Sequence, residues 1–402
     1  MTILQLVKKG VRRVFRPYTS KEPFQAPPAD QSELPSESSV VAASQWQLIW
    51  RKFKRHKLAV GSGILVLVIY VVAVFVEFLA PGLPNQHDSQ FTHAPPQRIH
   101  LFRRTDEGLK FGAYVYALES AIDPERARRV YVPQEEHIIP LGFFVRGPEY
   151  EMWGGLITGS LHFFGPVNPE ETVYLLGADR LGRDVLTRII YGTRVSMSIG
   201  LIGVFISLIL GVLLGGISGY FGGPADTVIQ RVIEFVRSIP EIPLWMGLAA
   251  AIPLTWPPLR VYFAITIILS LIGWTGLGRE VRGRFLSLRG EDFVTAARLD
   301  GASEMRVIGV HLVPSFMSHI IASLTLAIPQ MILSETALSF LGLGLRPPVV
   351  SWGVLLQEAQ NVRSIANAPW LFWPGVAVIV AVLVLNFLGD GLRDAADPYS
   401  SH

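Results

Sequence analysis

No cysteine occurs among the 402 residues of this chain, which excludes disulfide bonds, thiolate metal sites and cysteine nucleophiles. Lysine is absent from most of the chain as well, because the last one is Lys110. Since a phosphate-binding loop of the GxxxxGK[ST] type needs its lysine, the region after Lys110 contains no such loop. Any nucleotide hydrolysis on which the protein depends is therefore expected on another chain.

Charged residues are scarce too. They make up 17% of the chain, and 50% of the residues are hydrophobic, whereas a soluble domain carries about 25% charged residues. The net charge of +3 is too small to indicate a nucleic-acid partner. The zinc-hydrolase motif HExxH and a pair of membrane-embedded aspartates are both missing, so we expect neither an intramembrane hydrolase nor a metal or cofactor site.

What is present instead is a series of apolar segments, each close to the roughly 20 residues that cross a bilayer as a helix. Six can be distinguished, at residues 58–79, 195–220, 228–252, 261–278, 311–334 and 371–388. The sequence therefore predicts an all-α polytopic membrane protein with six transmembrane helices.

The polar stretches define the remaining organisation. Residues 1–45 are predicted to be a disordered tail, although the apolar and basic residues of 1–15 also suit a membrane surface. Residues 81–173 are too polar to cross the membrane and contain strand-like runs at 111–118 and 137–146, so we predict a small domain outside it. Residues 46–80 are expected to hold a basic lead-in and the first span, residues 174–390 a five-helix core, and residues 391–402 a C-terminal tail.

Basic residues predict the orientation, because those close to a span are retained on the cytoplasmic side. Arg51, Lys52, Lys54, Arg55 and Lys57 precede the first span. Six arginines lie between residues 279 and 306, whereas the connections after the third and fifth spans hold only Arg260, and Arg346 with Arg363. Both patterns predict a protein of the cell (inner) membrane with both termini in the cytoplasm. Residues 81–173 are then expected on the extracytoplasmic side of that membrane.

The connection after the fourth span, EDFVTAARLDGASEMRVIGVHLVP at residues 291–314, is longer than a turn between spans requires. Glu291 and Asp292 suit a helix N-terminus, Gly301 suits the positive φ that ends a helix, and Ser303 suits the cap of the next one. We predict a helix, turn, helix element on the cytoplasmic face that docks a soluble partner. The alternative is an interfacial loop that only orients the spans.

This segment resembles the EAA motif of ABC importer permeases, in which Glu-Ala-Ala is followed by Gly and later by a hydrophobic-x-Leu-Pro ending. The matching positions are Thr295, Ala296, Ala297, Gly301, His311, Val313 and Pro314, with Thr295 in place of Glu and Val313 in place of Leu, and Ala302 adds a further small residue. Three more blocks resemble the C-type subunit of dipeptide and oligopeptide permeases: LGADRLGRDVLTRIIYGTRVSMSIGL at 176–201, LSETALSFLGLGLRPPVVSWG at 333–353 and GDGLRDAADP at 389–398.

The resemblance covers residues 176–398 and the first span, and it implies a type I ABC importer permease fold. It also implies partners: a second, homologous permease, two ABC ATPase subunits that receive the 291–314 segment, and an extracytoplasmic solute-binding protein. The implied substrates are di- and oligopeptides, with nickel, opines or oligosaccharides as alternatives. A secondary transporter, the other class considered, is expected to show internal repeats and ionisable residues at mid-membrane, whereas here the charges cluster at the ends of the spans.

Polar residues at and inside the spans complete the candidates. Asp179, Arg183, Asp184 and Arg194, with Arg180 and Arg188 among them, either pair to fix the start of the second span or contact a binding protein or a peptide terminus. His319, Gln330 and Asn386 either line a pathway or hydrogen-bond between helices. Glu77 and Glu335 are expected to reach the membrane boundary, and Gly203, Gly211, Gly215, Gly216 and Gly219 to form a face for close helix packing. Residues 342–353 are predicted to form a loop that acts as a gate or as a simple return.

Overall fold

The computed structural model describes residues 45–105, 108–123 and 128–396. The chain divides into two units, Met1–Leu48 and Ile49–His402, and the membrane-spanning helices and the sheet belong to the second. The predicted N-terminal tail lies outside the described residues except for Gln45, where helix α2 (Gln45–Arg55) begins. Residues 397–402 of the predicted C-terminal tail lie outside them too.

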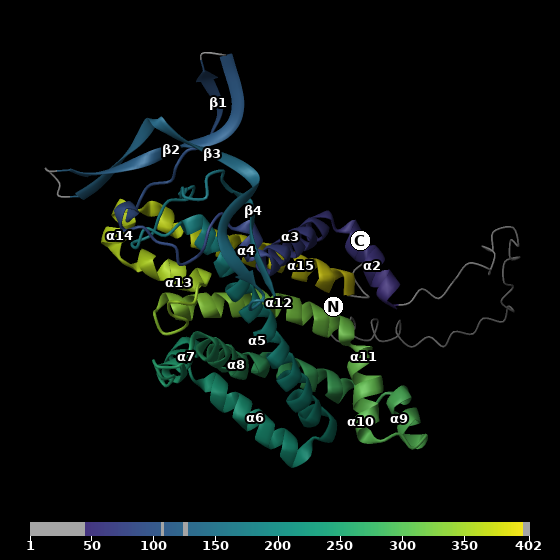
Figure 1. Cartoon of the computed structure of the whole chain (residues 1–402). Helices are drawn as coiled ribbons and strands as arrows, with labels where there is room; N and C mark the ends of the chain where they lie inside the picture. The colour runs from purple at the N-terminus through teal and green to yellow at the C-terminus, as the bar shows by residue number, and fades with distance from the viewer. Residues whose placement is uncertain (1–44, 106–107, 124–127, 397–402) are drawn as a thin grey trace, which may run out of the picture. The chain divides into compact units, whose positions relative to one another are not determined.

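Five of the described helical segments are long and apolar enough to cross a membrane: α3 (Lys57–Val74), α5 (Val185–Phe221), α8 (Pro258–Leu288), α12 (Met317–Phe340) and Pro369–Ala396, which contains α15 (Trp373–Ala396) (Figure 1). Each overlaps one predicted span. The first predicted span, residues 58–79, is divided at Phe75 into α3 and the one-turn helix α4 (Val76–Leu79). Helix α15 continues to Ala396, so the first residues of the predicted C-terminal tail are helical.

The third predicted span, residues 228–252, is not one helix. It consists of α6 (Gly223–Ser238) and α7 (Glu241–Ala250), with Ile239 between them in an extended conformation. Pro240 explains the break, because proline lacks an N–H and forces the residue before it out of the helical region. The prediction of an unbroken third helix is therefore wrong.

Glycines set the distance between α5 and α8, in agreement with the predicted small-residue face. A Cβ added to Gly215 would lie 2.3 Å from the carbonyl oxygen of Gly278, so the two backbones approach more closely than a side chain would permit. Contacts advance in the same direction along both helices, from Gly203 with Ser270 to Gly215 with Gly278. The helices α5 and α8 are therefore parallel.

The other helix contacts define two faces of the bundle. Ala59, near the start of α3, packs against Gly391 near the end of α15. Arg194, near the start of α5, donates a hydrogen bond to the carbonyl oxygen of Ala73 near the end of α3. The start of α3 and the ends of α5, α8 and α15 therefore lie at one face, which we call the elbow face. The end of α3 and the start of α5 lie at the opposite one, the sheet face.

The described residues between His100 and Pro166 form an antiparallel four-stranded sheet of order β1-β2-β3-β4. The strands are β1 (His100–Thr105), β2 (Gly108–Asp123), β3 (Arg128–Met152) and β4 (Ile157–Pro166). Both predicted strand-like runs fall inside it, in β2 and β3. The all-α fold class is accordingly wrong for residues 81–173 and describes only the membrane-spanning part of the chain.

Short helices complete both faces. The connection between α8 and α12 contains α9 (Asp292–Leu299), α10 (Glu304–Arg306), the π-helical segment η3 (Val307–Leu312) and α11 (Val313–Ser315). On the sheet face lie η2 (Ser89–Phe91), α13 (Trp352–Gln357), η4 (Glu358–Gln360), α14 (Val362–Asn367) and η5 (Pro369–Phe372). The predicted fifth span, residues 311–334, therefore begins too early, since its first residues belong to the connection.

Candidate functional site

The connection that we call the elbow, residues 292–312, turns at Gly301 as predicted. Gly301 has φ +81°, and it follows the last turn of α9. The N–H of Ala302 donates to the carbonyl of Ala297, and the N–H of Gly301 donates to that of Arg298. These two bonds form a Schellman motif, which ends a helix and redirects the chain. Ser303 occupies the predicted N-cap position of α10, but its side chain makes no capping hydrogen bond.

The elbow has an inner and an outer side. Val294, Ala297, Val307 and Leu312 are buried in a cluster with Phe285 of α8 and Tyr220 of α5. The outer side exposes large apolar side chains, since Leu299 is 83% and Met305 69% exposed. An amphipathic element that presents apolar side chains to solvent is typical of a surface that another protein covers.

The candidate residues of the EAA-like motif divide between these two sides. Thr295, Ala296 and Gly301 are exposed, as is Pro314 in α11. Ala297 is buried, and Ala302 is half-buried against the same cluster. Ala297 therefore helps to pack the elbow against α8, whereas Thr295, Ala296 and Gly301 are open to a partner.

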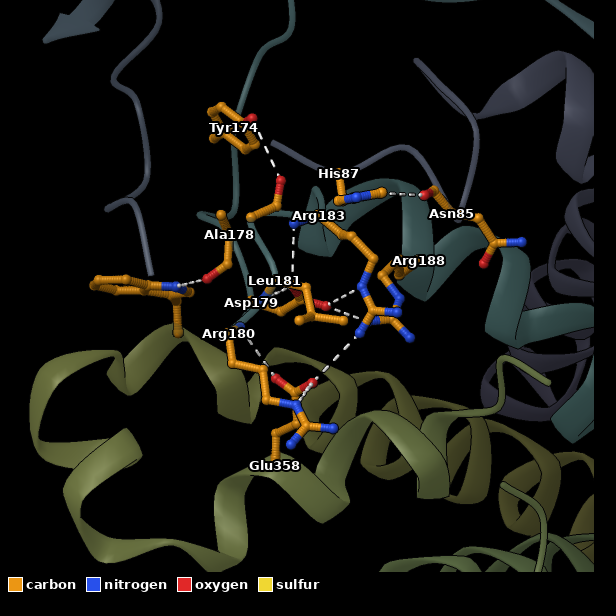
Figure 2. A network of polar contacts seen from close by, with 12 residues as sticks. Asn85, His87, Tyr174, Ala178, Asp179, Arg180, Leu181, Arg183, Arg188 and Glu358 are labelled. Carbon is orange, nitrogen blue, oxygen red and sulfur yellow. Dashed lines mark hydrogen bonds and ion pairs between the residues drawn. The ribbon is translucent and has the colours of Figure 1, made fainter. Parts of the chain in front are cut away.

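At the sheet face, a network of charges surrounds Asp179 (Figure 2). Its carboxylate accepts hydrogen bonds from Nε of Arg183 at 2.7 Å and from Arg188, and both arginines are nearly buried. Glu358 of η4 lies 3.5 Å from Arg183 and 3.4 Å from Arg180. Buried opposite charges in such contact hold their segments in register, so the network ties the start of α5 to η4.

The loop that carries Asp179 can form only with glycine at two positions. Gly182 has φ +73°, and a Cβ added there would lie 1.9 Å from the carbonyl oxygen of Asp88. Gly177 has φ +81° and lies against the ring of Trp370, whose Nε1 donates to the carbonyl of Ala178. The glycines of the LGADRLGRD block are explained by this close approach of the backbone.

Asp184 has a different role from Asp179. It is the N-cap of α5, where its Oδ2 accepts a hydrogen bond from the N–H of Thr187 at 2.8 Å. Burial raises the pKa of Asp184 to about 6, although the hydrogen bonds from Thr187 oppose that shift. Its carboxyl group therefore titrates close to neutral pH.

Arg194 lies apart from that network. It donates to both oxygens of Glu77 and to the carbonyls of Ala73 and Val74. These carbonyls end α3 and have no partner within the helix, so Arg194 caps α3 and neutralises Glu77. The four predicted residues at this face thus have three separate roles. Asp179 and Arg183 belong to the charge network, Asp184 caps the start of α5, and Arg194 binds the end of α3 and Glu77.

Known proteins resemble this chain in the sequence of its membrane-spanning helices. Residues 211–401 match the family described as binding-protein-dependent transport system inner membrane component, and residues 44–96 match the N-terminal TM domain of oligopeptide transport permease C. The dipeptide transport system permease protein DppC of Bacillus subtilis is 37% identical over 57% of this chain and 70% of its own. The chain belongs to this family of permeases.

Other relatives agree with that assignment. The oligopeptide transport system permease protein OppC of Bacillus subtilis is 34% identical to this chain, over 57% of this chain and 73% of OppC. The DppC protein of Alkalihalophilus pseudofirmus is 28% identical to this chain, over 95% of this chain and 97% of DppC. As a member of the family, the permease is a transmembrane subunit rather than an enzyme, and it works with ATPase subunits and a solute-binding protein.

A buried polar cluster around Glu335 of α12 is not predicted from the sequence. Glu335 lies near the end of α12 at the sheet face, as expected, but its side chain is fully buried rather than extended toward water. Its carboxylate accepts hydrogen bonds from the hydroxyls of Ser339 and Ser351, both at 2.8 Å, and from that of Ser196 at 3.4 Å. The same hydroxyls accept from backbone N–H groups of Leu345, Val354 and Trp352, respectively. Glu335 therefore organises the loop at residues 342–353.

The three candidates inside the spans are not brought together by hydrogen bonds. Nε2 of His319 lies 3.8 Å from Glu280 of α8. Gln330 is exposed and Asn386 is half-buried. Among the residues that the structure describes, the interhelical hydrogen bonds considered for Gln330 and Asn386 are not seen, and no group of His and carboxylate residues is arranged to hold a metal.

Proposed function

We propose that the permease is one of two homologous subunits that form the translocation pathway of an ATP-driven importer for di- and oligopeptides. The names of its relatives support the peptide substrate, because they include dipeptide and oligopeptide permeases. The glutathione transport system permease GsiD of Pectobacterium atrosepticum, 29% identical over 88% of the permease, transports another small peptide by its name. Oligosaccharides, opines or nickel are the alternative cargoes.

The proposal includes six membrane crossings, the third made of two pieces. Since α5 and α8 are parallel, the chain has to return across the bundle between them. The segment α6–α7 begins at the elbow face, where Asp226 pairs with Arg282 at 2.6 Å, and it leads to the start of α8 at the other face. Its two helices of 16 and 10 residues cover about 39 Å at 1.5 Å per residue, enough to cross the bilayer.

We further propose that the elbow face is cytoplasmic. The arginines in the last turns of α8 and after it, and the basic residues before α3, belong to this face, and such residues are retained inside the cell. The last described residue, Ala396 at the end of α15, belongs to the same face. The sheet then lies outside the cytoplasm, within reach of a solute-binding protein.

The exposed apolar side chains of the elbow carry the assignment of the ATPase site. Leu299 and Met305 lie on the outer side of a rigid, Schellman-closed turn. Burial of such side chains in a complementary groove stabilises association by about 1.5 to 3 kcal/mol each. Because the inner side of the elbow packs on α8, a movement of the docked ATPase would be passed directly to that helix.

The docking site can be tested with a matched pair of exposed residues. Leu299→Asp places a charge on the outer side of the elbow, and Val362→Asp places one on α14, where the side chain is 80% exposed. We expect Leu299→Asp to lower both co-purification of the ATPase subunits and solute-dependent ATP hydrolysis. Val362→Asp should leave ATPase co-purification unchanged. Equal retention of the ATPases by both variants would contradict the assignment.

Substrate class is tested separately on the assembled importer. Uptake of labelled di- and oligopeptides into proteoliposomes with ATP inside and binding protein outside should exceed uptake of a labelled oligosaccharide or of nickel. Transport of one of the other cargoes with no peptide uptake would reject the peptide substrate and leave the elbow result intact.

A further inference from the structure

The hairpin between β3 and β4 has an apolar tip that the proposed transport function does not use. The tip runs from Met152 to Ile157, through Trp153, two glycines and Leu156. Leu156 is 80% exposed, and Trp153 and Ile157 are exposed as well. Within the described part of the chain, each of these three residues keeps more than 40% of its surface exposed.

Two contacts fix the position of the hairpin relative to the first span. Nε1 of Trp153 donates a hydrogen bond of 3.0 Å to the carbonyl oxygen of Val74, the last residue of α3. Nδ1 of the buried His162 in β4 lies 2.7 Å from the carbonyl oxygen of Ala80, which directly follows α4. The hairpin therefore lies beside the C-terminal end of this span.

The length of α3 places that end near a membrane boundary. It has 18 residues, which correspond to about 27 Å at 1.5 Å per residue. The hydrocarbon core of a bilayer is about 30 Å thick. Trp153, bonded to the last residue of α3, consequently lies at the level where hydrocarbon meets headgroups.

Aromatic side chains gather at the same level. The ring of Phe75 lies 5.7 Å from that of Trp153, and the ring of Phe78 lies 6.3 Å from Phe144 and 6.0 Å from Phe163. Tryptophan is enriched where membrane meets water, because it joins an apolar body to a polar N–H, and the phenylalanine rings add apolar surface beside it. This grouping is continuous with the exposed apolar side chains of α3.

We propose that the tip of the β3–β4 hairpin inserts into the headgroup region of the lipid bilayer and anchors the sheet there. The insertion is shallow, because β4 is an edge strand whose outer backbone groups need water. The backbone of the turn has an unusual conformation, which leaves the side chains of the tip exposed. Trp153 has φ +53°, which is uncommon for a residue other than glycine, and Gly154 and Gly155 follow with φ +72° and +90°.

The absence of native cysteine allows a direct test. Single cysteines at Leu156 and Ile157 carry a nitroxide spin label in the assembled importer, reconstituted in liposomes. Leu67→Cys, on an exposed position of α3, serves as the lipid reference. Phe111→Cys, 76% exposed on β2, serves as the water reference, because Figure 1 shows the β1–β2 hairpin away from α3.

Collisions with lipid-soluble oxygen and with a water-soluble nickel chelate are then compared. We expect the oxygen-to-nickel accessibility ratio at both tip positions to be severalfold higher than at Phe111 and lower than at Leu67, because Leu67 lies near the middle of α3 and the tip inserts only to headgroup depth. A ratio like that of Phe111 would place the tip in water and overturn the proposal. Protection from both reagents would overturn it as well, because a protein partner would then cover the tip.

Discussion

Single buried residues in this permease are explained by the groups that surround them rather than by their own type. Three serine hydroxyls hydrogen-bond to the fully buried carboxylate of Glu335. Asp184 and Asp179 stand five positions apart and differ in role, since one caps a helix and the other joins two arginines.

Replacement of Glu335 tests the buried cluster. Glu335→Gln keeps an oxygen that can accept from Ser339 and Ser351, so we expect a small loss of thermal stability. Glu335→Ala leaves buried hydroxyls without an acceptor, at a cost of about 1 to 3 kcal/mol for each unsatisfied group. The loop at 342–353 should then become more sensitive to limited proteolysis than in the Gln variant. Identical proteolysis of the two variants would argue against the role given to Glu335.

Asp184 predicts a dependence of stability on pH. Its folded pKa of about 6 lies above the ordinary value of 3.8, so the stabilisation linked to its protonated form is complete below about pH 4 and is lost as pH rises through about 6. The Asp184→Asn variant keeps an N-cap side chain and lacks this titration. The melting temperature of the wild type, relative to Asp184→Asn, should therefore be higher at pH 5 than at pH 7.5. A difference that does not change with pH would contradict the prediction.

At the scale of elements, small residues and proline decide how the helices pack and where they break. The glycine face of α5 is predictable from the sequence, because the spacing of the glycines indicates one face. The break at Pro240 also has a sequence signal, but high hydropathy conceals it. The pairing of Glu358 with Arg183 has no such signal, since the two residues are 175 positions apart and nothing local indicates which segments meet.

Two adjacent glycines of α5 provide a matched test of helix packing. A Cβ at Gly215 would lie 2.3 Å from the Gly278 carbonyl oxygen, whereas one at Gly216 would lie 3.4 Å from the ring of Phe285, an ordinary contact. We expect Gly215→Ala to push α5 and α8 apart and destabilise the permease by about 1 to 3 kcal/mol. Gly216→Ala should be close to neutral. Melting temperatures of the purified complex would reveal the contrast, and equal values would count against the close-contact interpretation.

For the whole molecule, the family, the membrane class and the order of the long helices are predictable from composition, charge and motifs. Gly301 and the elbow turn follow from local chemistry as well. The length of the strands cannot be predicted from the sequence, because the alternation of apolar and polar residues does not indicate where a strand ends. The level of the β3–β4 hairpin also depends on contacts with Val74 and Ala80, more than 70 positions away in the chain.

Membrane topology can be measured on the cysteine-free chain. Met305→Cys at the elbow and Val362→Cys in α14 are both highly exposed. In intact cells that produce the permease without its ATPase subunits, a membrane-impermeant maleimide should label Val362→Cys and should label Met305→Cys only after the membrane is opened. Labelling of Met305→Cys in intact cells would reverse the proposed orientation.

The close contact between α5 and α8 has a mechanical consequence. Because their backbones touch, we expect the two helices to move together, and α5 alone has 37 residues, or about 55 Å at 1.5 Å per residue. On that length, a rotation of about 6° at one end displaces the other by about 6 Å. A small movement of the docked ATPase subunits at the elbow would thus produce a larger displacement at the Asp179 network, which in the proposed orientation lies at the outer face of the membrane.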